Sequence, residues 1–140
     1  MAVDTKLSSQ VELFISCNDL PKMDRLSRSD PFGVVSWIQP NGTRTEIGRT
    51  ETIYDTHDPQ FTTQLRVEYF FEQNQKLRFD IYDEDKKGSH NLSDHDFIGY
   101  CEMQLSEVGT LFIRTHVLCY IVVLCVCRFW PRLAVHCDAV

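Results

Sequence analysis

The chain has 140 residues, of which 43% are hydrophobic and 24% are charged, and its formal net charge is -6. This length and balance are typical of one globular domain with a buried core. The negative charge and the lack of any lysine-rich or arginine-rich run exclude a general nucleic-acid binder. The first ten residues are polar, so no secretory signal is visible there, and we expect a cytoplasmic protein with reduced cysteines.

Short segments typical of strands follow one another as far as Leu105, and most of them alternate apolar and polar residues. Val34–Ile38 is instead a short apolar run, which an Asn41-Gly42 hairpin turn joins to its partner strand. No helical period of useful length precedes Gly109. The predicted strands cover Val11–Cys17, Val34–Ile38, Thr43–Thr50, Phe61–Tyr69, Leu77–Tyr82 and Phe97–Leu105. Short strands with turns about every eight to twelve residues predict an all-β fold, an antiparallel sandwich or barrel, rather than a parallel α/β sheet.

The connection between the last two predicted strands is crowded with acids. Asp83 and Asp85 stand at the end of one strand, and Asp96 stands just before the next. Such acids can reach a common point once the backbone turns, which suits a hard cation that takes several oxygen ligands. The connection nearly matches a helix-loop-helix calcium loop, but Lys87 and Asp94 replace two required ligands and both flanks have strand periodicity. A solvated charged loop is the alternative interpretation.

A second acidic loop joins the first two predicted strands. It carries Asp24, and it carries Asp30 directly before a proline. If both loops lie at the same end of the sandwich, five carboxylates meet in one cup. Their mutual repulsion raises their pKa values and lowers stability until a cation binds.

Other candidate sites are weaker. His57 lies beside two acids, but no activated serine or cysteine accompanies it, so we interpret it as a turn histidine and expect no enzyme. His90 and His95 flank the acidic loop and are interpreted as surface histidines rather than transition-metal ligands. A basic sheet face that meets phosphoinositide head groups is a further hypothesis, although outward strand positions are commonly basic. Its residues would be Arg66, Lys76 and Arg78.

Several motifs taken together resemble a calcium-binding C2 domain. They are Asn18-Asp19-Leu20-Pro21, Asp24-x5-Asp30-Pro31, Asp58-Pro59-Gln60-Phe61, Phe79-Asp80-Ile81-Tyr82-Asp83-x-Asp85 and Asp96-Phe97-Ile98-Gly99. Over about residues 8–109 the chain resembles the first C2 domain of copines. That similarity is carried by Ser27-Arg28-Ser29-Asp30-Pro31, Ile47-Gly48-Arg49-Thr50-Glu51, Val67-Glu68-Tyr69-Phe70-Phe71-Glu72, Gln75-Lys76-Leu77-Arg78-Phe79 and Asn91-Leu92-Ser93-Asp94-His95-Asp96-Phe97-Ile98-Gly99.

The resemblance implies calcium-dependent binding of anionic phospholipid membranes, with Ca²⁺ as the cofactor, room for protein partners, and no nucleic acid or small-molecule substrate. The implied calcium ligands are Asp24, Asp30, Asp83, Asp85 and Asp96. The implied membrane-contacting residues of the loops are Met23, Arg25, Leu26, Arg28, Lys86 and Lys87. In calcium-mediated signalling, such a protein would move from the cytoplasm to the plasma membrane when calcium rises.

The resemblance also implies a permuted strand order, in which no strand precedes Val11–Cys17 and the closing strand comes last. Copines continue with two more strands of this domain, a second C2 domain and an adhesion-type domain, none of which the sequence contains. We therefore expect a C2 domain at residues 1–109 without its last two strands, followed by an unmatched apolar, cysteine-rich tail at 110–140. The alternatives are a calcium-independent protein-interaction module and a non-functional truncated isoform.

The tail contains an apolar run of 11 residues, Val117–Cys127. A membrane-spanning helix needs about 17 to 25 apolar residues, so this run is too short to span. Its β-branched residues favour a substitute strand over a helix, and we expect a strand pairing between about Leu111 and Cys125.

Overall fold

A computed structural model describes residues 8–22, 26–106 and 120–125. These ranges contain seven strands and one short 3-10 helix. The elements are β1 (Ser8–Cys17), β2 (Pro31–Ile38), β3 (Arg44–Arg49), β4 (Leu65–Phe70), β5 (Lys76–Asp83), η1 (Leu92–Asp94), β6 (Asp96–Gln104) and β7 (Tyr120–Cys125). None of the helical segments described is long and apolar enough to cross a membrane.

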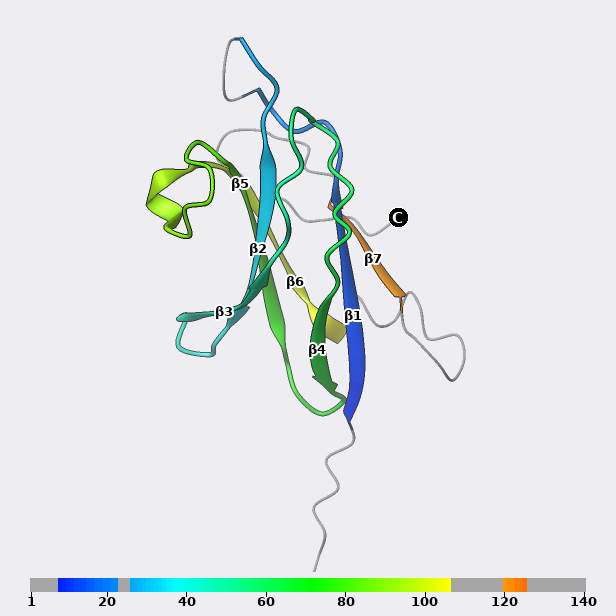
Figure 1. Cartoon of the computed structure of the whole chain (residues 1–140). Helices are drawn as coiled ribbons and strands as arrows, with labels where there is room; N and C mark the ends of the chain where they lie inside the picture. The colour runs from blue at the N-terminus through cyan, green and yellow to red at the C-terminus, as the bar shows by residue number, and fades with distance from the viewer. Residues whose placement is uncertain (1–7, 23–25, 107–119, 126–140) are drawn as a thin grey trace, which may run out of the picture.

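The strands form two sheets that pack face to face (Figure 1). One sheet has the order β4-β1-β7 and the other has the order β3-β2-β5-β6. Every neighbouring pair is antiparallel except β1 and β7, which run parallel with Leu13 opposite Ile121. The prediction of an all-β antiparallel sandwich is therefore confirmed, with one parallel pair that the sequence did not indicate.

The core lies between the sheets and is made by the inward side chains of both. The alternation of β1 is regular, since every second residue from Val11 to Cys17 is buried. The facing sheet contributes Val35, Leu77, Phe79, Ile81, Ile98 and Cys101 to the same cluster. Burying one such aliphatic or aromatic side chain stabilises the fold by about 1.5 to 3 kcal/mol.

The strand predicted at Phe61–Tyr69 is shorter in the structure, where β4 begins only at Leu65. The Glu51 carboxylate accepts hydrogen bonds from the backbone N–H groups of Thr62 and Thr63. These N–H groups are thus bonded to a side chain instead of to a neighbouring strand, which delays the start of β4.

A β-bulge shifts the register between β5 and β6. Ile81 lies opposite Gly99, whereas Tyr82 lies opposite Phe97, so Ile98 is an extra residue. Ile98 packs into the core at 5% exposure, and Phe97 next to it is 45% exposed. The same shift places Asp83 directly opposite Asp96. A bulge thus aligns two of the predicted calcium ligands, as bulges near functional sites often re-aim side chains.

Two sequence predictions concern the chain ends. β7 lies within the range expected to supply a substitute strand, and six of its residues pair with β1. The expected domain boundary at residue 109 remains a prediction. β1 begins at Ser8, before its predicted start at Val11. Residues 1–7 lie outside the described residues, so the expectation that no strand precedes β1 stays a prediction. Cys101 is disulfide-bonded, so the expectation that all cysteines stay reduced does not hold for this residue.

Candidate functional site

Three aspartates of the predicted cup lie in, or directly before, neighbouring strands at one end of the sheet β3-β2-β5-β6. Asp83 is the last residue of β5 and pairs with Pro31 on one side and with Asp96 on the other. Asp30 directly precedes Pro31. Antiparallel pairing brings these positions together because β2 and β6 begin where β5 ends.

Hydrogen bonds between backbone and carboxylate link the acids at this end. Asp83 accepts a bond from the Asp30 N–H at 2.7 Å, and the N–H of Glu84 donates to the Asp30 carbonyl at 3.0 Å. Asp85 accepts a bond from the Asp96 N–H at 2.7 Å. The structure thus brings together Asp30, Asp83, Asp85 and Asp96, whereas Asp24 lies outside the described residues.

A third loop, residues 50–64 between β3 and β4, also contacts this end, and the sequence reasoning missed it. The Asp55 N–H donates to the Asp30 carboxylate at 2.7 Å, and the Thr56 N–H donates to the Ser29 carbonyl at 3.0 Å. Asp55 has a positive φ of 55°. An aspartate in a turn-rich stretch was the available signal, because Asp tolerates this left-handed conformation better than most residues.

Two acids of the loops have perturbed pKa values. Burial raises the pKa of Glu51, but hydrogen bonds from Thr63 and Thr62 outweigh it and hold this pKa at about 2. The Ser89 hydroxyl and the Lys86 ammonium group lower the pKa of Asp94. Asp94, which no ligand motif includes, therefore serves as an internal brace of the β5–β6 loop.

The predicted membrane-contacting residues that the structure describes are exposed. Leu26 is 101% exposed, and Arg28, Lys86 and Lys87 are also exposed. The Lys87 ammonium nitrogen lies 5.5 Å from the centre of the Tyr54 ring, so the β3–β4 loop also contributes an aromatic side chain here. Met23 and Arg25 lie outside the described residues.

The donor chemistry of this end suits Ca²⁺, since its carboxylates are hard oxygen ligands. Among the residues that the structure describes, however, no three His, Cys, Asp or Glu side chains are grouped closely enough to hold a metal ion. Three of the four described aspartates, Asp30, Asp83 and Asp85, accept bonds from backbone N–H groups. The assignment of calcium ligands remains a prediction.

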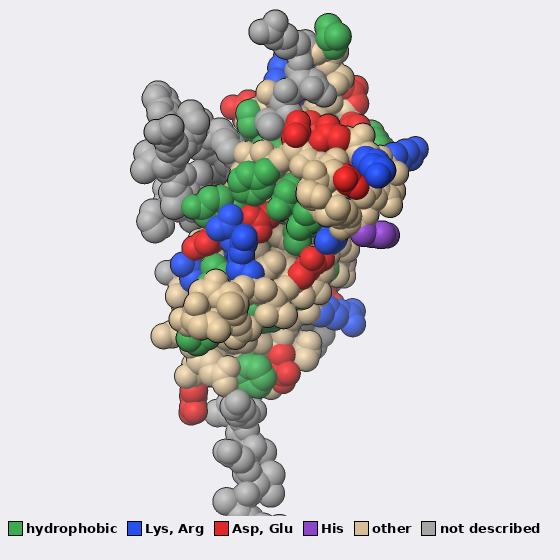
Figure 2. Space-filling model, turned by 90° about the vertical axis from the view of Figure 1, so that its left-hand side faces the viewer, with side chains coloured by type: hydrophobic (Ala, Val, Ile, Leu, Met, Phe, Trp, Pro, Cys, Tyr) green, Lys and Arg blue, Asp and Glu red, His purple; other side chains and the backbone are tan. Residues whose placement is uncertain are grey.

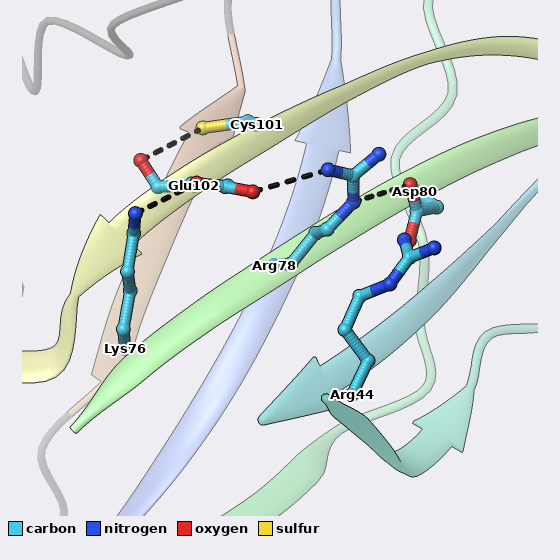
Figure 3. Close-up of polar contacts among 6 residues, drawn as sticks. All are labelled: Arg44, Lys76, Arg78, Asp80, Cys101 and Glu102. Carbon is cyan, nitrogen blue, oxygen red and sulfur yellow. Dashed lines mark hydrogen bonds and ion pairs between the residues drawn. The ribbon is translucent and has the colours of Figure 1, made fainter. Parts of the chain in front are cut away.

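The hypothesis of a basic sheet face is wrong. Arg66 belongs to β4 and Arg78 to β5, so they lie in different sheets. Figure 3 shows that the cations near Arg78 are paired. The distances are 2.7 Å for Lys76–Glu102, 2.8 Å for Arg78–Asp80, 3.0 Å for Arg78–Glu102 and 3.5 Å for Arg44–Asp80. Figure 2 shows the resulting mixture of blue and red side chains on this side of the molecule.

The histidines differ in their surroundings. His90 is exposed, as expected of a surface loop histidine. His95 is only 7% exposed, so its interpretation as a surface residue is wrong. The reason is that the 3-10 helix η1 turns the chain back and directs His95 beneath the β5–β6 loop. There its ring packs against Phe32 in a T-shaped arrangement, with 5.2 Å between the ring centres.

Comparison with known proteins identifies the family. Residues 11–119 match the model of the C2 domain. The chain belongs to the C2 domain family. C2 domains are binding modules, generally without enzymatic activity, and the two-sheet architecture described above agrees with this assignment.

Individual proteins are similar to this chain in sequence or in structure. The C2 domain is 34% identical over 126 residues to Nicotinic receptor-associated protein 1 of Caenorhabditis elegans, which covers 77% of the chain but only 20% of that protein. It is 27% identical to the BON1-C2B structure, covering 76% of this chain and 70% of that one with a TM-score of 0.53. The calcium-bound C2A and C2B domains of Extended-Synaptotagmin 2 are 20% identical with a TM-score of 0.55, covering 76% and 37%. This last likeness shows the fold alone.

Proposed function

We propose that this C2 domain binds anionic phospholipid membranes in a calcium-dependent manner, through the loops that carry its aspartates. The observation that supports the proposal is the convergence of Asp30, Asp83, Asp85 and Asp96 at one end of the sandwich. Asp24 would complete the ligand set. Such open loops keep waters, so we expect a calcium Kd on the order of 10⁻⁶ to 10⁻³ M in the absence of lipid.

The loop residues would have two separate roles at the membrane. Without a cation the aspartates repel anionic lipid, and bound Ca²⁺ would supply positive charge and accept phosphate oxygens into its coordination shell. Exposed side chains around the acids would contact the bilayer, with Leu26 entering the apolar layer and the cations meeting head groups. These cations are Arg25, Arg28, Lys86 and Lys87, and Met23 would accompany Leu26.

In a cell this activity would move the protein from the cytoplasm to the plasma membrane when calcium rises. The sequence motifs make the copine family the proposed origin of the domain. The competing function is a calcium-independent protein-interaction module. It is favoured by the backbone bonds to Asp30, Asp83 and Asp85, because each of these carboxylates already accepts a hydrogen bond within the protein.

The decisive experiment is sedimentation with liposomes that contain phosphatidylserine, with calcium and with a chelator. The variant Asp83→Asn/Asp85→Asn should lose calcium-dependent binding. Asparagine keeps an acceptor oxygen, so the bond from the Asp30 N–H survives and circular dichroism should show an intact fold.

The matched control is Glu68→Gln/Glu72→Gln, which removes the same charge at the opposite end, near the pairing of Ser8 with Phe70. This control should bind like the wild type. Undiminished binding by the aspartate variant would reject the ligand assignment, and wild-type binding that ignores calcium would favour the interaction module.

A further inference from the structure

His95 lies between Asp94 and Asp96 in the sequence, and its side chain contacts the β5–β6 loop at two points. Its ring nitrogen Nδ1 accepts a hydrogen bond from the Asp85 N–H at 3.2 Å. Its other ring nitrogen, Nε2, lies 3.0 Å from the carbonyl oxygen of Ser89. The side chain therefore links residues at the start and in the middle of the loop to the first residue before β6.

These two contacts define one tautomer of the ring. An N–H group can only donate, so Nδ1 must be unprotonated to accept from Asp85. A carbonyl oxygen can only accept, so Nε2 must carry the proton that it donates to Ser89. Only the neutral ring with its proton on Nε2 makes both bonds at once.

Holding the Asp85 backbone in place also affects the position of its carboxylate, which is one of the predicted calcium ligands. Asp85 also accepts, through its carboxylate, the bond from the Asp96 N–H at 2.7 Å. His95 directly precedes Asp96 in the chain. The bond from the Asp85 N–H to His95 and the bond from the Asp96 N–H to Asp85 therefore close a ring that includes both aspartates. The imidazole also packs against the Phe32 ring in a T-shaped arrangement, with 5.2 Å between the ring centres.

Other bonds brace the loop without touching the acids of the proposed site. The Ser89 hydroxyl donates to the Asp94 carboxylate, and the Lys86 ammonium group pairs with the same carboxylate at 3.5 Å. The Arg49 guanidinium donates to the His90 carbonyl at 2.8 Å. His95, in contrast, bonds directly to the Asp85 backbone.

We propose that His95 is the positioning residue of the calcium site, and that its unprotonated Nδ1 holds the Asp85 backbone where the Asp85 carboxylate can act together with Asp96. This inference rests on the proposed calcium-binding function. The proposal requires a hydrogen-bond acceptor at the position of Nδ1. A buried ring without such an acceptor would not hold the Asp85 backbone.

Three substitutions of His95 distinguish the effect of the Nδ1 acceptor from the effect of ring packing on Phe32. In His95→Asn, the side-chain oxygen can occupy the position of Nδ1 and accept from Asp85. In His95→Gln, the amide nitrogen can replace Nε2 as donor to Ser89, but no acceptor stands at Nδ1. In His95→Phe, the ring that packs on Phe32 is kept and both bonds are lost.

In isothermal titration with calcium, the Kd of each variant should depend on whether it keeps an acceptor at the position of Nδ1. We expect Kd within about threefold of wild type for His95→Asn and raised about tenfold for His95→Gln and His95→Phe, the ratio given by one lost hydrogen bond. Thermal midpoints measured in a chelator should not follow this order, because His95→Phe keeps the most apolar packing. His90→Phe, an exposed residue of the same loop, should leave Kd unchanged.

Nitrogen-15 NMR of the histidine rings gives a readout that does not depend on calcium. The expected signature is a protonated Nε2 and an unprotonated Nδ1 for His95, with slow exchange of the Asp85 amide in the wild type and in His95→Asn only. A proton on Nδ1 would overturn the proposal.

The calcium titration distinguishes two failures. A wild-type protein that gives no calcium signal rejects the proposed function, and the role of His95 falls with it. A wild-type protein that binds calcium with a Kd shared by His95→Asn and His95→Phe rejects only the role of His95.

Discussion

At the scale of single residues, Asp80 shows how this domain manages charge on a sheet face. Its side chain is only 6% exposed and contacts two arginines, Arg78 at 2.8 Å and Arg44 at 3.5 Å. The Arg78 guanidinium carbon also lies 3.6 Å from the centre of the Tyr100 ring. A buried carboxylate is tolerated here because cations surround it, and the arginines are in turn unavailable to an outside anion.

We therefore predict that Asp80→Ala lowers the free energy of unfolding by about 3 kcal/mol, since it leaves the half-buried Arg78 with less compensation. Urea denaturation measures this loss. The matched variant is Glu46→Ala, which breaks the more exposed pair of Glu46 with Arg49 at 2.6 Å. It should cost at most about 1 kcal/mol. If both variants lose the same free energy of unfolding, the buried pair stabilises the fold no more than the exposed one, and the prediction is wrong.

At the scale of elements, β7 forms one edge of the three-stranded sheet. β1 is the middle strand of that sheet, with β4 on one side and β7 on the other. Parallel pairs are slightly less stable per residue than antiparallel pairs, yet this pair covers the β1 backbone from Glu12 to Cys17. An uncovered β1 would present a row of free N–H and C=O groups, which invites association with other chains.

Ending the chain after Cys119 should therefore lower the thermal midpoint and increase association, because β1 loses six paired positions. Calorimetry and light scattering measure the two effects. A chain that ends after Cys125 is the matched control, since it keeps β7 and lacks only residues 126–140. If both truncations melt alike, β7 adds nothing to the sheet.

At the scale of the whole molecule, the net charge of -6 and the acidic end make the domain sensitive to divalent cations. A ligand that binds only the folded state raises stability by mass action. The aspartates also repel one another when no cation is present, so their mutation should not weaken the calcium-free domain.

We predict that calcium at about one hundred times its Kd stabilises the wild-type domain by about 2.7 kcal/mol, seen as a higher thermal midpoint. Asp83→Asn/Asp85→Asn should show no calcium shift and, in a chelator, should melt no lower than the wild type. A calcium shift of equal size in this variant would contradict the predicted site.

The local features of the domain were predictable from the sequence. The period-two alternation located β1, β4, β5 and β6, and the Asn41-Gly42 dipeptide, a hairpin signal, marks the turn between β2 and β3, where Gly42 has a φ of 83°. The acids before β2 and around the β5–β6 connection could be assigned to loops for the same reason. Alternation and turn chemistry depend on neighbours in the chain, so a single sequence is enough to reveal them.

What only the tertiary structure decided depends on residues far apart in the chain. The sequence by itself determined which loops carry the acids. Register between strands decided that Asp83 faces Asp96 across a bulge, and packing decided that Asp55 reaches Asp30 and that His95 is buried against Phe32. The pairing of Arg78 with Asp80 and Glu102 likewise follows from which strands are neighbours. Hydrogen bonds and ion pairs of this kind have no periodic signature, because each joins groups that come together only once the sheets have formed.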